Sequence, residues 1–159
     1  MAVHPDPEFM RRAIALARKG MLAGAGGPFG CVIVRAGEIL AEGHNRVLAT
    51  HDPTAHAEIV ALRAACARVG HFELRGCDLY TSCEPCPMCL GAAHWARVDR
   101  IFFAANREDA AGGGFDDEWL YREIVAPLAD RRIPTASLLR SEAAPLFREW
   151  LAKPDRTPY

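Results

Sequence analysis

A chain of 159 residues, half of them hydrophobic and a quarter charged, is long enough for one hydrophobic core and short for several domains. Nineteen basic residues nearly balance twenty acidic ones, and the formal net charge of -1 argues against an extended nucleic-acid track. No apolar run approaches the roughly 18 residues of a membrane span, and no secretory signal opens the chain. We therefore expect a single domain over residues 1–159, in the cytoplasm, with its six cysteines reduced.

The first segment predicts a helix followed by a glycine-rich turn. Asp6-Pro7 is typical of a helix start, with an N-cap followed by proline at the first helical position. Five apolar residues then recur at the spacing of one helix face: Met10, Ala13, Ile14, Ala17 and Met21. Residues 24–28 follow a helix and lack a terminal Lys-Ser/Thr, so they are not a phosphate loop. We expect a turn there whose glycines take positive φ.

A hairpin and a second helix are predicted next. Residues 30–45 form the hairpin, two apolar strands joined by a tight turn at Ala36-Gly37. Asp52-Pro53-Thr54 repeats the chemistry of a helix start, and an alanine-rich helix over residues 55–69 follows it.

The second half of the chain alternates strands and helices. The strands are predicted at residues 79–81, 101–105 and 136–139, and the helices at 86–96, from near Asp116, and at 142–151. Residues 112–114, three glycines, indicate a loop. Helices that alternate with strands after an opening hairpin imply an α/β fold, a mixed sheet covered on both faces.

Two short motifs carry the chemistry. His56-Ala57-Glu58 is followed, thirty positions after the histidine, by Cys86 and Cys89 in the segment Pro-Cys-Pro-Met-Cys. One imidazole and two thiolates make three zinc ligands and leave the fourth tetrahedral position open for water, as in catalytic sites. Glu58 is then free to move protons. The cysteines lie at a helix start, whose partial positive charge stabilises thiolates.

The spacing leaves two questions open. Residues at i and i+2 lie on opposite sides of a helix, so His56 and Glu58 can serve one centre only if the metal lies beyond the helix N-terminus. Cys83 and Cys86 form a second Cys-x-x-Cys pair, and the alternative is a closed structural site that also uses Cys83. Such a site has no use for Glu58, so we expect Cys83→Ala to retain one zinc per chain.

The paired motifs resemble those of the zinc-dependent cytidine deaminase superfamily. Within it, the chain is similar to the bacterial-type guanine deaminases in several further stretches, which cover nearly its whole length: residues 26–30, 45, 52–58, 80–91, 95–97, 114–117 and the terminal Tyr159. The resemblance implies a three-layer α/β/α sandwich around a five-stranded mixed β-sheet. It also implies a homodimer in which a C-terminal tail, residues 152–159, is exchanged between subunits.

Residue roles follow from the same resemblance. His56, Cys86 and Cys89 would bind one Zn²⁺ per chain, and Glu58 would carry protons to the ring and the leaving amine. Asp117 would hold the substrate and assist proton transfer. The other substrate-binding candidates are Asn45, Phe29, Trp95 and Tyr159, of which Asn45 would hydrogen-bond the purine and Tyr159 would close the site of the neighbouring subunit.

The resulting hypothesis is hydrolytic deamination of guanine to xanthine and ammonia. Alternatives from the sequence are deamination of tRNA adenosine, where a flipped base enters a similar pocket, or of another amino-heterocycle. The net charge of -1 and a tail with only Lys153 and Arg156 as bases disfavour the tRNA alternative. A third alternative, an inactive zinc-stabilised scaffold, would have no need of Glu58 and Asp117.

Overall fold

The computed structural model describes residues 5–159. Contacts divide the chain into two compact units, one ending at Asp117 and the other covering Glu118–Tyr159. The first unit holds the sheet and every buried residue, so it contains the core of the protein. No helix among residues 5–159 has the length and apolar character needed to cross a membrane.

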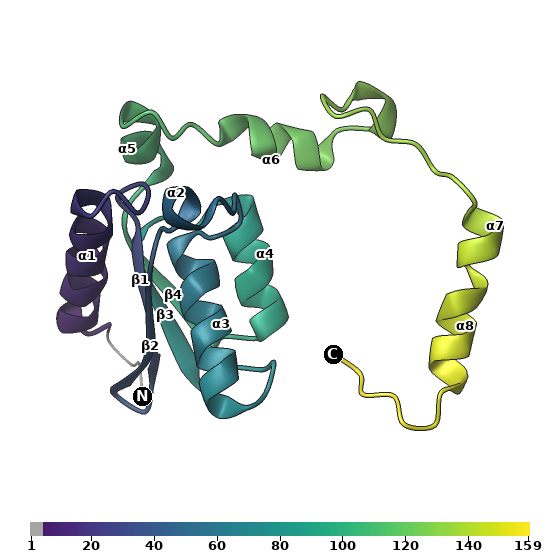
Figure 1. Ribbon diagram of the computed structural model, residues 1–159, viewed down its shortest axis with the longest axis horizontal. Helices are drawn as coiled ribbons and strands as arrows, with labels where there is room; N and C mark the ends of the chain where they lie inside the picture. Colours follow the sequence, from purple (N-terminus) through teal and green to yellow (C-terminus); the bar gives the residue numbers. More distant parts are fainter. Residues whose placement is uncertain (1–4) are drawn as a thin grey trace. The chain divides into compact units, whose positions relative to one another are not determined.

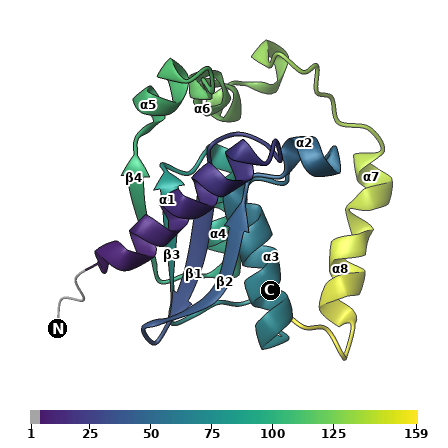
Figure 2. The same ribbon diagram turned by 60° about the vertical axis from the view of Figure 1, so that its left-hand side comes forward.

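A mixed sheet of four strands forms the centre of the first unit, with the order β2-β1-β3-β4 (Figure 2). The strands are β1 (Gly30–Arg35), β2 (Glu38–His44), β3 (Cys77–Cys83) and β4 (Arg100–Ala105). Strand β1 pairs antiparallel with both β2 and β3, whereas β3 and β4 run parallel. The β1–β2 hairpin is as predicted, and Ala36 and Gly37 both take the positive φ that a tight hairpin turn needs.

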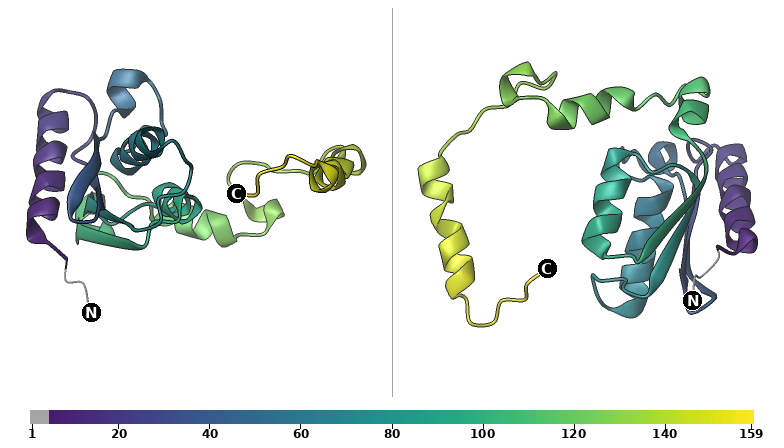
Figure 3. Two further views of the ribbon diagram at one scale, coloured as in Figure 1. Left: turned by 90° about the horizontal axis from the view of Figure 1, so that it is seen from below. Right: turned by 180° about the vertical axis from the view of Figure 1, so that it is seen from behind.

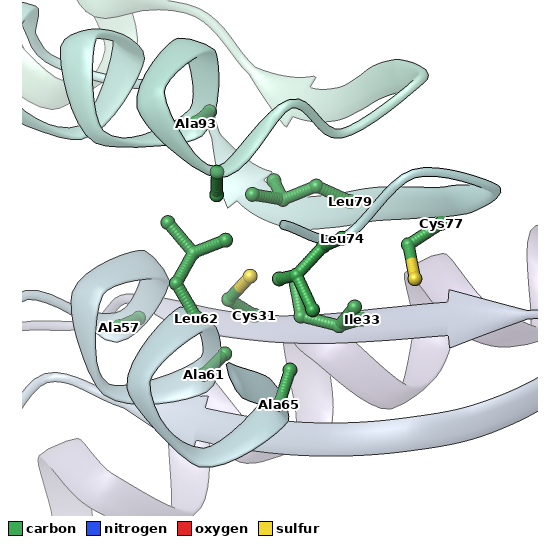
Figure 4. Packing of buried hydrophobic residues seen from close by; sticks show 11 residues of the cluster. Cys31, Ile33, Ala57, Ala61, Leu62, Ala65, Leu74, Cys77, Leu79 and Ala93 are labelled. Carbon is green, nitrogen blue, oxygen red and sulfur yellow. The ribbon is translucent and has the colours of Figure 1, made fainter. Parts of the chain in front are cut away.

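Helices cover both faces of this sheet (Figures 1 and 3). Helix α1 (Pro7–Leu22) lies on one face, and α3 (Ala57–Val69) and α4 (Pro87–Ala96) lie on the other. The larger core cluster fills the α3/α4 side, where Leu62 and Ala93 meet Cys31, Ile33 and Leu79 of the strands (Figure 4). The arrangement is the predicted three-layer α/β/α sandwich.

Helix α1 begins where the sequence predicts, because the Asp6 side chain accepts a hydrogen bond from the backbone N–H of Glu8. Its buried face is only partly the predicted one. Ile14 and Met21 are about two-fifths exposed (39% and 43%), and Leu16 packs against Val32, Val34 and Tyr80 instead. Small residues complete that face: Ala13, Ala17 and Gly20. The buried face of α1 is therefore narrower than the spacing of its apolar residues predicts, and its centre lies near Leu16.

The start of α3 also differs from the prediction. Asp52 does not cap the helix, because its carboxylate accepts hydrogen bonds from the N–H and hydroxyl of Thr54 and closes a turn. The short helix α2 (Val47–Thr50) precedes this turn, and α3 begins only at Ala57, with His56 as its N-cap. The later start leaves His56 in extended backbone at the end of the helix, a position from which its side chain can turn toward a neighbouring element.

An unpredicted helix follows β4. Helix α5 (Arg107–Gly112) starts with a capping box, in which Asn106 and Asp109 each bond the other's backbone N–H. Positive φ at Gly114 then ends the helical segment and leads the chain to Phe115 and Asp117.

The second unit contains four short helices and no strand: α6 (Glu118–Val125), η1 (Leu128–Asp130), α7 (Arg140–Ala143) and α8 (Pro145–Ala152). The strand predicted at residues 136–139 is therefore wrong, and the sheet within residues 5–159 has four strands instead of five. A strand needs a partner for its backbone groups, and this segment has none. Its apolar side chains are exposed, Leu138 by 84%. The final helix is divided at Pro145, which has no N–H to continue α7.

Candidate active site

The two sequence motifs lie at the N-termini of two neighbouring helices. His56 is the N-cap of α3 and Cys86 is the N-cap of α4, both in extended backbone. Pro87 occupies the first position of α4, where its missing N–H costs nothing, and Cys89 lies in the same first turn. Because α3 and α4 pack side by side on one face of the sheet, the partial positive ends of both helices point to one place.

The three side chains converge there. His56 Nδ1 lies 3.6 Å from Cys86 Sγ and 3.5 Å from Cys89 Sγ. Among residues 5–159 these three form the cluster able to hold a metal ion, with all ligand atoms within 4.8 Å of one another. A tetrahedral zinc with ordinary bond lengths separates a nitrogen ligand from a sulfur ligand by about 3.5 Å. The donor set and its spacing therefore fit Zn²⁺.

Mutual hydrogen bonds shift the pKa values of the cluster. The hydrogen bond from Cys89, helped by His56, lowers the pKa of the Cys86 thiol to about 4 in spite of burial. The hydrogen bond to Cys86, followed by burial, raises the pKa of Cys89. The hydrogen bond to Cys86 also raises the pKa of His56. The lowered pKa of Cys86 favours its thiolate form, which is the form that binds a cation.

Glu58 faces the same cluster from the first turn of α3. Only 6% of the residue is exposed, and its Oε1 accepts a hydrogen bond of 3.1 Å from the hydroxyl of Thr81. Its other neighbour is the Cys89 thiol, within hydrogen-bonding reach. Burial raises the pKa of Glu58, so the group holds a proton more readily than an exposed carboxylate. The geometry that the sequence required, a centre beyond the N-terminus of α3, is present.

Cys83 is not part of the cluster. It ends β3, is buried, and its thiol donates to the backbone carbonyl of Asn106 at 3.6 Å. Burial raises its pKa to about 11, so the group is a neutral thiol. Cys83 therefore does not serve as a fourth ligand among the described residues. Three protein ligands leave one tetrahedral position of the metal open.

Asn45 and Asp117 are the two further polar residues predicted for this site. Asn45 follows β2, is 95% buried, and precedes Arg46, whose N–H bonds the carbonyl of Ala55 immediately before His56. Burial, followed by the negative charge of Cys86, raises the pKa of the Asp117 carboxyl group. These observations relate both residues to the metal cluster, and their roles toward a substrate stay predictions.

The aromatic candidates are distributed differently. Phe29 precedes β1 and packs edge-to-face against Phe115, with ring centroids 4.9 Å apart at 86°. Trp95 lies on α4 with 68% of its surface exposed. Tyr159 belongs to the second unit, where its ring meets Trp150 at 6.5 Å. The contact with Phe115 links Phe29 to the loop that carries Asp117.

Comparison with known proteins identifies the family. Residues 4–105 match the cytidine and deoxycytidylate deaminase zinc-binding region. The chain belongs to this deaminase family. Its His/Cys/Cys cluster is the zinc-binding site of the family, and its sandwich is the cytidine deaminase-like fold.

Relatives within the family differ in substrate. The guanine deaminase of Bacillus subtilis is 52% identical over 142 residues, which cover 89% of this chain and 91% of the relative. The tRNA-specific adenosine deaminase of Aquifex aeolicus is 36% identical over 126 residues, 79% of this chain and 81% of the relative.

Two solved structures of guanine deaminases also match this chain. The crystal structure of the Bacillus subtilis guanine deaminase matches with a TM-score of 0.95 and 48% identity, over 98% of this chain and 99% of that chain. The guanine deaminase of Nitrosomonas europaea matches with a TM-score of 0.67 and 30% identity, over 96% of this chain and 87% of that chain.

Sequence reasoning included two further residues in the stretches that resemble the family but gave neither a role. Thr81 is 99% buried and is a hydrogen-bond partner of Glu58. Phe115 contacts Phe29 at the start of the segment that carries Asp117. Thr81 stands in the strand before the cysteine motif, a position that could have suggested it, whereas Phe115 is 86 positions from its partner in a glycine-rich loop.

Proposed function

We propose that this chain is a zinc-dependent guanine deaminase, which hydrolyses guanine to xanthine and ammonia. The observation that carries the proposal is a buried carboxylate, Glu58, beside a three-ligand zinc site, in a chain 52% identical to the guanine deaminase of Bacillus subtilis. Deamination needs an activated water and a group that moves protons. Both requirements are met by side chains at the N-termini of α3 and α4.

His56, Cys86 and Cys89 would hold the metal, and zinc in such a site lowers the pKa of a bound water toward about 7. Glu58 accepts the proton of the attacking water at its carboxylate. It then delivers that proton to the ring nitrogen next to C2, the carbon that bears the amino group. A raised pKa suits this role, because the carboxyl group must hold the proton between the two transfers.

The remaining polar groups bind the purine and assist the leaving group. Asp117 carries a raised pKa beside the metal cluster, which supports a role in proton delivery to the departing ammonia. The amide of Asn45 hydrogen-bonds the ring, and Phe29 forms an apolar wall. Trp95 would contribute only at the outer edge of the pocket, since it lies on an exposed face of α4.

The whole chain, residues 1–159, would function as one deaminase domain within a homodimer. No side chain of Glu118–Tyr159 is buried, and apolar residues such as Val125 (81% exposed) and Phe147 (73%) need a protein surface to cover them. We infer that a second copy covers them, with residues 152–159 exchanged so that Tyr159 closes the partner's site. The six free thiols fit a reducing cytoplasm.

Ammonia release from zinc-loaded protein tests the reaction, with guanine, guanosine, cytosine, adenine and tRNA offered separately. Turnover of guanine well above the others supports the proposal. Turnover of tRNA alone, with steep salt dependence, would replace it by the adenosine reaction. Silence on all five would favour the inactive scaffold.

Mixed dimers test the exchange. Glu58→Gln and Tyr159→Ala chains would each be weak alone. If the tail acts on the partner, a mixed dimer regains one site with both wild-type residues. Activity that rises on subunit mixing supports the exchange, and a strictly additive mixture contradicts it.

A further inference from the structure

Backbone conformation explains only one of the glycines in the turn before β1. Of the three glycines at 24, 26 and 27, only Gly24 has positive φ (68°), so the prediction for the other two is wrong. Gly26 has a backbone that any residue could adopt. The reason for glycine at position 26 is instead steric, because neighbouring atoms leave no room for a side chain.

Asn45 occupies the space that a side chain at position 26 would need. A Cβ on Gly26 would lie 2.0 Å from Asn45 Oδ1 and 2.9 Å from its Cγ, closer than real Cβ atoms approach. The Asn45 carbonyl oxygen would be a further 3.1 Å contact. Any residue other than glycine therefore displaces the amide of Asn45 or moves the loop.

The loop is not free to move away. On one side of Gly26, the carbonyl of Ala25 accepts hydrogen bonds from the N–H groups of Leu48 (3.1 Å) and Ala49 (3.0 Å) at the start of α2. On the other side, the carbonyl of Phe29 accepts a hydrogen bond of 2.9 Å from the N–H of Asn45. These hydrogen bonds hold the segment of Gly26 and the segment of Asn45 together on both sides of the close contact. The side-chain amide of Asn45 is therefore the part that would shift.

The orientation of that amide decides what Asn45 can offer a ligand. Its Oδ1 accepts a hydrogen bond of 3.1 Å from the N–H of Val47. Among residues 5–159, no group accepts a hydrogen bond from Nδ2, and this nitrogen is not one of the buried atoms without a partner. Asn45 therefore presents a hydrogen-bond donor, and no acceptor, beside the His56 end of the metal cluster.

We propose that Gly26 is a positioning residue for substrate recognition, because its lack of a side chain lets Asn45 hold Nδ2 as a donor toward an acceptor atom of the purine, such as O6 or N7. The inference rests on the proposed deaminase function and adds the polarity of this contact and the residue that fixes it. A ligand with a hydrogen-bond donor at the same position would leave two donors facing each other, which is unfavourable.

A double-mutant cycle with Gly26→Ala and Asn45→Ala tests the inference on zinc-loaded protein, with guanine as substrate. We expect Gly26→Ala to raise KM about 10- to 100-fold, the cost of one lost or unsatisfied hydrogen bond. We expect kcat and zinc content to change less than KM. In the Asn45→Ala background, where the clashing Oδ1 and Cγ are gone, Gly26→Ala should add less than about threefold. Equal costs in both backgrounds would show that Gly26 only shapes the loop, and would overturn the proposal.

Two further variants keep the test decisive. Gly112→Ala is the matched control, because a Cβ there meets no atom within 4 Å and the backbone φ is not positive; it should leave KM unchanged. Should Gly26→Ala fail to fold, Asn45→Asp serves instead, since it keeps an acceptor for the N–H of Val47 and puts a carboxyl oxygen in place of the donor. Asn45→Asp should raise KM at least as much as Asn45→Ala, and a wild-type KM would refute the donor assignment. Wild-type turnover of guanine tests the proposed function separately, before any variant is compared.

Discussion

Replacement of Thr81 by valine offers a direct test of how Glu58 is held. The two side chains meet through one hydrogen bond of 3.1 Å, in which the hydroxyl donates to Glu58 Oε1. Both residues are buried, with 1% of Thr81 and 6% of Glu58 exposed, so water cannot replace the lost donor. Valine has the same shape and lacks only the hydroxyl, and the change therefore isolates this contact.

The expected loss can be derived from the bond itself. A hydrogen bond to a charged group contributes about 1.5–3 kcal/mol. Only one donor to one carboxylate oxygen is removed, so we expect the lower part of this range, about 1.5–2 kcal/mol, or about 10- to 30-fold in kcat. Thr81 is too deeply buried to touch a ligand, so KM should change by less than about threefold.

The assay is steady-state conversion of guanine, with zinc content measured on every preparation. Thr81→Ser is the matched control, because it keeps the hydroxyl and removes the methyl group; its kcat should stay within about threefold of wild type. If Thr81→Val turns over guanine at the wild-type rate, the hydroxyl does not hold Glu58. If Thr81→Ser loses as much as Thr81→Val, the loss comes from packing and the reasoning fails.

Three more predictions concern the cluster and the sheet. Glu58→Gln should retain zinc and lose several orders of magnitude in kcat, and near-normal turnover would remove Glu58 from the mechanism. Cys83→Ala should keep one zinc per chain by elemental analysis, because the Cys83 thiol donates a hydrogen bond to the carbonyl of Asn106. Loss of zinc from this variant would support the closed structural site that includes Cys83. The Arg12 guanidinium lowers the pKa of Glu42 below its usual 4.5, so the pair stabilises the fold above that pH and less as the carboxylate is protonated in the folded state. Glu42→Gln should therefore cost about 0.5–1 kcal/mol in urea unfolding at pH 7 and progressively less as the pH falls below 4.5. A cost that does not fall with pH would refute the ionic origin.

The parts of the site that could be predicted are marked by local sequence signals, which lie within a few residues of one another. Helix starts are marked by caps and proline, and these local signals are sufficient to place Cys86 and Cys89 at the start of α4. A zinc ion needs several protein ligands, so the sequence also predicts that His56 lies close to Cys86 and Cys89. Local chemistry and the requirements of zinc together were sufficient for the cluster.

The missed contacts join residues that are distant in sequence and carry no common pattern. Thr81 meets Glu58 across 23 positions, and nothing in a buried strand shows which polar residue bonds a helix carboxylate. The strand predicted at residues 136–139 failed for a related reason. A short apolar run gives no information about a pairing partner, and without one its backbone groups stay in water.

Glycines explain why the catalytic groups are placed so closely, and they do so through distance more than through flexibility. A Cβ on Gly43 of β2 would lie 2.4 Å from the carbonyl oxygen of Ala57 and 2.8 Å from the N–H nitrogen of Ala61, so the first turns of α3 rest directly on the strand. A side chain at position 43 would lift that end of α3, and His56 and Glu58 would move with it. Gly26 acts in the same way on the side chain of Asn45. The start of α3, which carries His56 and Glu58, and the amide of Asn45 thus both lie closer to a glycine than any side chain would allow.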